Sequence, residues 1–283
     1  MHVANQSYGK SRVRLTRVTR KGDRHFIIEL TADIRLDGDF NATYETGDNS
    51  SVVPTDTMKN TVYALAKRKG APDIETFAQT LARHFTQNFD QVDTAHVRLT
   101  ERPWKRLVFE GVEHPHAFLG TSSERATCAA TATGSGSEVQ VVSGIQDLVV
   151  LKTTGSGFVG YVKDEFTSLK ETEDRILATN VAAEWSYRNQ VGGPVTRIRV
   201  REVILKVFAE QHSLSVQQTL HSIGAAVLNA CPEIEAITLD MPNLHRLLVD
   251  LSPFEMDNEN EIFLPVDEPH GTISATITRD GTS

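Results

Sequence analysis

The chain has 283 residues, of which 39% are hydrophobic and 23% are charged, and its formal net charge is -8. These values are typical of a globular protein, and they exclude a collagen, a disordered chain and a disulfide-rich scaffold. At roughly 150 residues per domain, the length predicts about two structural units. The longest apolar runs are far shorter than the roughly 20 residues that a membrane span needs, so we expect a soluble protein.

The chain ends and the cysteines indicate the compartment. The N-terminus has no apolar stretch of the secretory kind, and the C-terminus is not of the Ser-Lys-Leu type that peroxisomes recognise. Cys128 and Cys231 lie far apart among apolar or small residues. This context predicts two buried free thiols in a reducing compartment rather than a disulfide or a metal pair. We therefore expect a cytoplasmic protein that does not bind a membrane.

Charge is distributed unevenly, because residues 1–24 are basic and residues 233–283 are acidic. Within the basic part, charged and apolar residues alternate over Arg12–Val18, which predicts a strand with one charged face. We expect this face to meet acidic groups of the same protein or of a neighbouring subunit. Nucleic acid is not an expected partner, since the whole chain is acidic.

The first half of the chain predicts a hairpin, two helices and two further strands. The hairpin joins residues 12–18 to 25–36, and the strands lie near 95–100 and 107–111. The first helix has an apolar face over 58–66, with Thr55 or Asp56 as its cap and Gly70 as its stop. The second helix follows Asp73 and extends to about residue 85. A loop over 133–137 ends this half.

The second half repeats strands and then helices. Strands are predicted at 138–143, 148–153 and 158–162, and again at 236–239, 247–251 and 272–278. One helix is predicted to open at Thr167 or Ser168, where Ser168 and Glu171 form a capping-box pattern. Two more helices are predicted over 195–208 and 216–228.

This order indicates an internal duplication. Gln79-Thr80-Leu81 recurs as Gln218-Thr219-Leu220, each time in the second helix of its half. We therefore predict an α+β protein with antiparallel sheets and helices on one face, divided into units at 1–134 and 135–283. Each sheet would keep an open edge that a partner subunit could cover, so we expect an oligomer.

Common cofactor motifs do not occur in the sequence. It has no dinucleotide-binding fingerprint, no phosphate loop and no Cys-x-x-Cys. His114 and His116 could ligate a metal, but without a convincing third ligand nearby a loop pair that hydrogen-bonds is favoured. We therefore expect neither a metal nor a cofactor.

Four short polar segments are candidates for a ligand site, and each has an ordinary structural explanation. Residues 53–56 begin a helix, where free N–H groups favour anions but Thr55 or Asp56 could simply cap. Arg175 follows Glu171 by four positions, as in a helix-surface ion pair. Gln217 lies at another helix start, and Asn243 and His245 would share one side of an extended strand. The residues alone leave these alternatives open.

Together these segments resemble the urate oxidase (uricase) family over nearly the whole chain. The matching stretches are Tyr8-Gly9-Lys10, Thr55–Asn60, Lys163–Thr172 with Asp174-Arg175, Ser215-Val216-Gln217, and Leu239–His245. The resemblance implies two tandem T-fold (tunnelling-fold) units, assembled as a homotetramer around a tunnel with active sites at subunit interfaces. It implies oxidation of urate by O2 and water to 5-hydroxyisourate and H2O2, without a cofactor, in urate degradation towards allantoin.

The resemblance also implies a role for individual residues. Lys10 and Thr55 match the family's proton-removing pair, His245 matches its relay partner, and Asn243 matches the polar group above the substrate, where oxygen and then water would lie. The substrate-binding residues that it implies are Thr55, Asp56, Phe158, Leu169, Arg175, Val216, Gln217 and Asn243. Two alternatives remain from the residues: a T-fold enzyme for pterins or GTP, which would generally need zinc, and a non-catalytic urate-binding protein, which would have no use for Lys10.

Overall fold

The computed structural model describes residues 3–4, 6–120, 123–136, 138–189 and 192–279. The chain is α+β and divides into two compact units. Unit 1 is Met1–Gly144 with Ser186–Arg197, and unit 2 is Ile145–Trp185 with Ile198–Ser283. Strands β7 (Val139–Lys152) and β8 (Leu177–Tyr187) run through both units. Residues 134 and 135, where the sequence predicts the boundary between two T-fold units, lie in the turn between β6 and β7, and that division stays a prediction.

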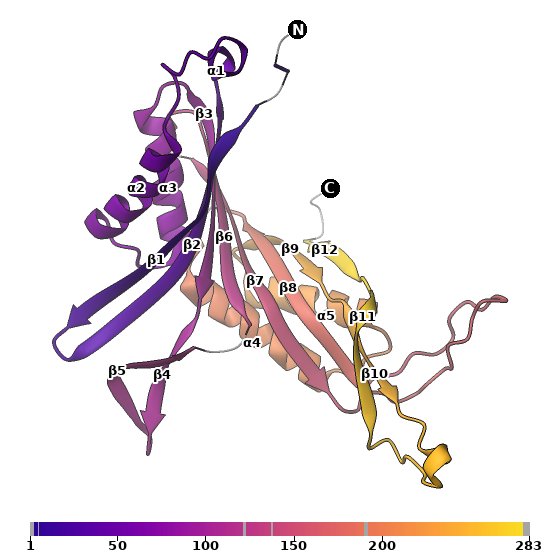
Figure 1. Cartoon of the computed structure of the whole chain (residues 1–283). Helices are drawn as coiled ribbons and strands as arrows, with labels where there is room; N and C mark the ends of the chain where they lie inside the picture. Colours follow the sequence, from indigo (N-terminus) through magenta and orange to yellow (C-terminus); the bar gives the residue numbers. More distant parts are fainter. Residues whose placement is uncertain (1–2, 5, 121–122, 137, 190–191, 280–283) are drawn as a thin grey trace. The chain divides into compact units, whose positions relative to one another are not determined.

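Unit 1 is an antiparallel sheet with helices on one face (Figure 1). The strand order is β1-β2-β3-β6, which continues into β7. The strands are β1 (Tyr8–Lys21), β2 (Arg24–Gly38), β3 (Val92–Arg102) and β6 (Arg125–Thr133), and β4 (Trp104–Phe109) pairs separately with β5 (Val112–Gly120). The helices are α1 (Asn41–Glu45), α2 (Thr55–Arg68) and α3 (Ile74–Asn88).

Alternation along β2 builds the core of unit 1. Leu30, Ala32, Ile34 and Leu36 are buried against the helices, and the residues between them face away. Helix α3 presents an apolar stripe that includes Phe77, Leu81 and Phe85, all fully buried. Asp73 caps α3 by accepting a hydrogen bond from Thr76 N at 2.7 Å. The predicted hairpin and second helix are confirmed.

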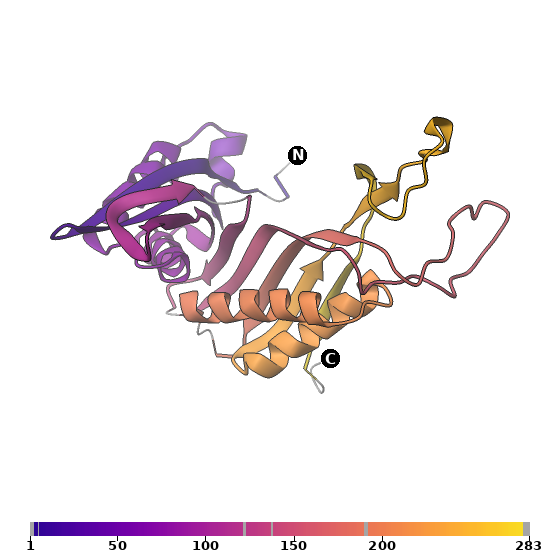
Figure 2. The same cartoon turned by 90° about the horizontal axis from the view of Figure 1, so that it is seen from below.

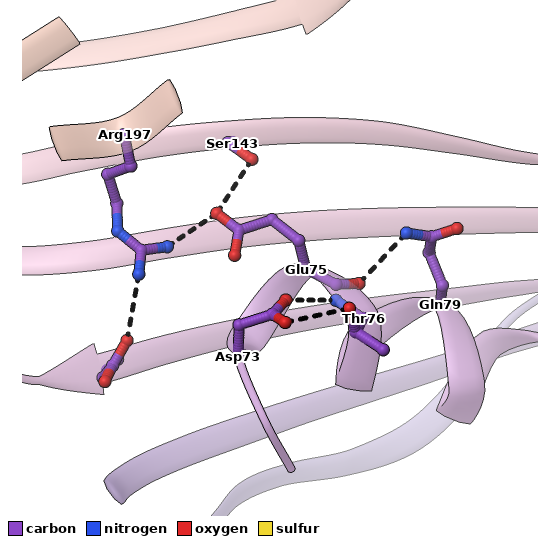
Figure 3. Close-up of polar contacts among 7 residues, drawn as sticks. Asp73, Glu75, Thr76, Gln79, Ser143 and Arg197 are labelled. Carbon is purple, nitrogen blue, oxygen red and sulfur yellow. Dashed lines mark hydrogen bonds and ion pairs between the residues drawn. The ribbon is translucent and has the colours of Figure 1, made fainter. Parts of the chain in front are cut away.

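A buried ion-pair network lies beside the start of α3 (Figure 3). Glu75 is fully buried, and its Oε1 accepts hydrogen bonds from Arg197 Nη1 at 2.6 Å and from Ser143 Oγ at 3.2 Å. The other guanidinium nitrogen, Nη2, lies 3.5 Å from Glu101 Oε2. Burial raises the pKa of Glu101, and Arg197 opposes this while Glu75 and Asp73 add to it. One arginine is thus shared between two carboxyl groups.

Unit 2 repeats the plan with its own strands and two helices. Its strand order is β7-β8-β10-β11, with β9 pairing both β8 and β12. The strands are β9 (Ile234–Asp240), β10 (Asn243–Leu248), β11 (Phe263–Gly271) and β12 (Ser274–Thr278). Helices α4 (Pro194–Glu210) and α5 (Val216–Ala230) lie on one side of the strands (Figure 2), and a short 3-10 turn covers Ser252–Phe254.

The duplicated motif lies where the sequence places it. Gln79-Thr80-Leu81 is in α3 and Gln218-Thr219-Leu220 is in α5, the second helix of a consecutive pair in each case. Cys128 and Cys231 are both buried and free, as predicted. No helix in the described part of the chain is long and apolar enough to cross a membrane. Ser137 of the predicted loop lies outside the described residues.

Several local predictions are wrong. Residues 153–176 form no helix, so neither the capping box at Ser168 nor the ion pair of Glu171 with Arg175 exists; Glu171 pairs with Lys163 instead. Residues 158–162 form no strand beyond an isolated bridge between Phe158 and Thr172. The two strands expected over 138–153 are one strand, β7.

Strands β5, β6 and β11 were not predicted, because their sequences lack a clear apolar alternation. Strand β8 was also not predicted, although its buried residues Val181, Ala183 and Trp185 alternate with half-buried ones. Every residue of β8 is buried or half-buried, so both of its faces are largely covered.

Candidate active site

The predicted site residues form two clusters, one in each unit. Lys10, Thr55 and Asp56 belong to unit 1. The others belong to unit 2, and they are Phe158, Leu169, Arg175, Val216, Gln217, Asn243 and His245.

Tyr8 fixes the first cluster by joining β1 to the segment before α2. Its hydroxyl accepts a hydrogen bond from Val53 N at 2.8 Å and donates one to Val53 O at 3.1 Å. Its ring packs edge-on against Phe40, with 4.8 Å between centroids. Burial raises the pKa of Tyr8, so it remains a neutral phenol. Since Lys10 and Thr55 each follow this pair by two residues, the bond holds them on neighbouring elements.

Thr55 is the first residue of α2 and does not cap it. The cap position is Pro54, which offers no side-chain hydrogen bond, so the expected capping role of Thr55 or Asp56 is wrong. The predicted stop is confirmed, because Gly70 follows the last turn with φ of 78°. The Thr55 side chain is half-buried and has no hydrogen bond within the described chain. Its hydroxyl is therefore available to a ligand.

Asp56 has its carboxylate occupied. It pairs with Lys59 and accepts a hydrogen bond from Asn60 Nδ2 at 2.9 Å. These contacts with Lys59 lower the pKa of Asp56, and the charge of Lys10 lowers it further. Lys10 therefore lies near the start of α2. Asp56 can offer a ligand its backbone N–H, which has no partner within the helix.

A β-bulge determines which face of β1 carries Lys10. Lys10 pairs with Ile34 and Val13 with Ala32, so β1 has one extra residue between these pairs. Arg12 has φ of 58° within the bulge, and its N–H donates to Asp33 Oδ1 at 2.8 Å. Residues directly opposite in an antiparallel pair share a face. Lys10 therefore lies on the face of Ile34, the face that α2 covers.

In the second cluster, Asp174 organises the segment that carries Phe158 and Arg175. Its carboxylate accepts hydrogen bonds from Thr154 Oγ1 at 2.7 Å and from Gly155 N at 2.8 Å. The bond from Thr154 is the main cause of its lowered pKa. The backbone N–H of Arg175 donates to Ser156 O at 2.7 Å. Irregular backbone thus holds Arg175 where a helix was expected.

Arg175 has an unpartnered, buried donor. Its Nε is buried and has no hydrogen-bond partner in the described chain, and burial lowers the pKa of its guanidinium. The guanidinium carbon lies 5.3 Å from the centroid of the Phe158 ring, which stacks on Tyr161 at 4.9 Å. A buried N–H donor without a hydrogen-bond partner is costly, so the surroundings of Arg175 Nε favour a bound acceptor such as an anion. A flat anion could stack on Phe158 beside it.

Ser213 connects this segment to the start of α5. Its N–H donates to Gly155 O at 2.9 Å, and Gly157 N donates to Ser213 O at 2.8 Å. Ser215 then caps α5 by accepting from Gln218 N at 3.1 Å. Within α5, Val216 is buried and Gln217 is exposed, with no hydrogen bond from the Gln217 side chain in the described chain. Arg175 and Gln217 are therefore held on two segments that share backbone hydrogen bonds.

The remaining candidates lie on β10 and in the irregular segment. Asn243 pairs with Thr179 of β8 and with Gly271 of β11, whereas His245 pairs with Val266. A register shift separates Asn243 from His245, so the simple alternation that placed both on one side is interrupted. Leu169 is 57% exposed, and its carbonyl accepts a hydrogen bond from Tyr161 at 2.6 Å.

The paired histidines hydrogen-bond, although on β5 rather than in a loop. His116 N donates to His114 Nδ1 at 3.3 Å. No group of three or more His, Cys, Asp or Glu side chains that could hold a metal occurs among the described residues. The sequence analysis assigned no role to Tyr8, Asp174 or Ser213, although Tyr8 and Asp174 lie in the stretches that carry the family resemblance. Tyr8 lies close to Lys10 in the sequence, and Asp174 directly precedes Arg175. This proximity could have indicated a supporting role for Tyr8 and Asp174.

Comparison with known proteins gives one consistent result. The family model described as Uricase matches residues 6–131 and 141–274. The uricase of Arthrobacter globiformis is 46% identical over 280 residues, covering 99% of this chain and 90% of that protein. The uricase of Oryctolagus cuniculus is 41% identical, covering 96% and 93%.

Solved structures agree with this result. The crystal structure of the uricase from Arthrobacter globiformis has a TM-score of 0.93 at 45% identity, covering 100% of this chain and 96% of that one. A uricase from Bacillus fastidious has a TM-score of 0.84 at 24% identity, covering 98% and 94%, and shows the shared fold. The predicted α+β T-fold is therefore confirmed. The chain belongs to the uricase family.

Proposed function

We propose that the chain oxidises urate at a site to which both clusters contribute, each from a different copy of the chain. As a member of the uricase family, the chain is an oxidoreductase that acts on urate with O2. Membership of the uricase family also argues against the two alternatives that the residues left open, a T-fold enzyme for pterins or GTP and a non-catalytic urate-binding protein. The observation that carries the proposed site is the buried, unpartnered Nε of Arg175 beside the Phe158 ring.

The second cluster binds the substrate. Urate is flat and anionic, with donors and acceptors along its edges. Arg175 offers a planar, two-pronged donor to one edge, and Gln217 pairs a donor and an acceptor with the opposite edge. Phe158 stacks on the ring. The backbone N–H groups of Val216 and of Asp56 from the other copy complete the contacts, and Leu169 forms an apolar wall.

The first cluster removes the proton. Lys10 acts through the hydroxyl of Thr55, which has no other hydrogen bond in the described chain. Lys10 takes up the proton of the Thr55 hydroxyl. Thr55 in turn takes the proton from urate. His245 relays protons, and Asn243 holds first O2 and then water above the ring.

The reaction then proceeds through the substrate itself. The electron-rich urate dianion gives two electrons to O2, which leaves as H2O2 after taking up two protons. Water adds to the oxidised ring and forms 5-hydroxyisourate. The protein contributes deprotonation, orientation and a site from which bulk water is excluded, so the proposed steps need no cofactor.

The candidate site residues are divided between the two units, which supports a site formed by two copies of the chain. Neither cluster alone contains both the proton-removing pair and the binding residues. We infer a homotetramer in which interfaces bring one copy's first cluster to another copy's second cluster. An open sheet edge is a common means of such assembly.

The proposed reaction is tested with purified, chelator-treated protein. Loss of urate absorbance with release of one H2O2 per urate is the expected result. Turnover that disappears with EDTA and returns with one added metal would contradict the proposed cofactor-free steps.

A further inference from the structure

The face of the unit 1 sheet that points away from α2 and α3 carries a concentration of arginines. A cavity of about 270 Å³ opens on this face, and its lining includes Arg12, Arg14, Arg102 and Arg125. These arginines come from β1, β3 and β6. The chain as a whole has a net charge of -8, so this local excess of positive charge does not follow from the overall composition.

Among the described residues that line the cavity, Glu29 is the one carboxylate, and that group is already engaged. Glu29 accepts a hydrogen bond from Trp104 Nε1 at 3.0 Å and lies 3.4 Å from Arg14 Nη2. Arg125 donates to the backbone oxygens of its neighbours Ser123 and Glu124. The positive charges of Arg12 and Arg102 therefore have no carboxylate partner in the described part of the chain.

Two of the guanidinium groups have N–H donors without a hydrogen-bond partner in the described chain. The side chains of Arg12 and Arg102 make no hydrogen bond or ion pair in the described chain, and Arg102 lies 5.1 Å from the Trp104 ring centroid. Stacking of that kind orients a guanidinium while leaving its N–H groups available.

The floor of the cavity adds neutral donors. Arg14 is directly opposite Thr31, and Thr31 is directly opposite Thr100, so the three share one row across the sheet. Both threonines line the cavity, and neither hydroxyl has a hydrogen bond in the described chain. Guanidinium forks around free hydroxyls are an arrangement that recognises phosphate-type oxygens.

We propose that this arginine pocket, lined by Arg12, Arg14, Arg102, Arg125, Thr31 and Thr100, binds a small multivalent oxyanion of the phosphate or pyrophosphate type. It is separate from the first cluster, because the bulge in β1 places Lys10 on the opposite face of the sheet. Its occupant does not take part in urate oxidation.

A small anion fits better than a nucleic acid. A second cavity on the same face is lined by Asp33, Arg35, His96 and Arg98. There carboxylates accompany the basic residues, since Asp33 lines the cavity and Asp37 lies 2.8 Å from His96 and 3.4 Å from Arg35. Carboxylates that follow the pocket along the face would repel an extended polyanion.

Titration calorimetry with pyrophosphate tests the proposal, with ionic strength held constant by NaCl. We expect saturable binding to the full-length protein, weakened at least tenfold by Arg12→Gln and by Arg102→Gln. Arg102→Lys should retain part of the affinity because the charge remains. Arg20→Gln, an exposed change on β1 outside the pocket, is the matched control and should bind normally. All four variants should keep urate turnover.

Three results would overturn the proposal. The first is equal affinity in all variants. The second is heat that NaCl alone reproduces, which would indicate an adventitious ion only. The third is a single-stranded oligonucleotide that binds the wild type more tightly than pyrophosphate does and loses affinity in the same variants, because the face would then be a polymer surface. Thermal unfolding of each variant without pyrophosphate confirms that it is folded.

Discussion

Lys10 and Arg14 lie four residues apart on β1, yet they belong to opposite faces of the sheet. Lys10 is paired with Ile34 of the helix-covered face, whereas Arg14 is paired with Thr31 of the open face. In a regular strand, residues separated by four positions share a face. The extra residue in the bulge between Lys10 and Val13 interrupts the alternation, so that residues on either side of the bulge that would share a face lie on opposite faces. It brings Lys10 near α2 and leaves the arginines on the other side.

Deleting Ser11 should therefore abolish turnover. Without the extra residue, either the register of residues 8–10 is lost or Lys10 moves to the open face. Tyr8 would move with it and lose its bonds to Val53, so we also expect lower stability. Ser11→Ala keeps the backbone length and is the control. Turnover per folded protein should be near zero for the deletion and near normal for Ser11→Ala; normal turnover in the deletion would disprove the role of the bulge.

Lys10 and Thr55 should behave as one proton-removing unit. Lys10→Met and Thr55→Ala should each reduce turnover severely, and the double variant should be little worse than the poorer single one. An analogue that needs no deprotonation should still bind all three. Because Thr55 does not cap α2, its loss should cost less than the roughly 0.5–2 kcal/mol that loss of a helix cap costs. Strictly additive losses in log turnover would mean that two independent groups are at work.

Removal of the Arg175 side chain should chiefly weaken binding. Arg175→Ala loses charge-assisted hydrogen bonds of about 1.5–3 kcal/mol each, so the affinity for urate analogues should fall by at least tenfold. Arg175→Lys keeps the charge but loses the planar fork, and we expect it to recover only part of that affinity. Unchanged analogue affinity in a folded Arg175→Ala protein would place the substrate elsewhere.

Glu101 should make stability fall as pH rises. Burial raises its pKa above the ordinary 4.5, so the folded state holds the proton more tightly than the unfolded state. Its contribution is complete below about pH 4.5 and is lost as pH rises through the raised value. The free energy of unfolding of the wild type should therefore decline relative to Glu101→Gln over this range. Urea unfolding of both proteins at several pH values checks this, and the opposite trend would contradict it.

The sequence predicted the regular elements well where a face is strongly apolar. The helical stripe of Phe77, Leu81 and Phe85 and the alternation in β2 both identify a buried face directly. The duplicated helix pair followed from the same patterns. These features depend on local periodicity, which a single sequence displays.

The site was harder to predict, because irregular backbone carries much of it. Ser168 and Glu171 form a capping pattern, yet the segment is held by Asp174, Ser213 and the Phe158–Thr172 bridge, which are contacts between distant residues. The bulge beside Lys10 has no signal in the alternation of Arg12, Val13 and Arg14. The candidate residues themselves came from resemblance to a family, and their roles remain predictions.

The shared active site is tested most directly by complementation. Lys10→Met and Arg175→Ala proteins, each nearly inactive alone, are co-expressed with different tags and purified over both. In such mixed oligomers, the first cluster of the Arg175→Ala chain and the second cluster of the Lys10→Met chain are both intact. We predict that urate turnover with H2O2 release returns to a substantial fraction of the wild-type rate. Mixed oligomers that contain both chains but remain as inactive as either parent would contradict a site formed by two copies.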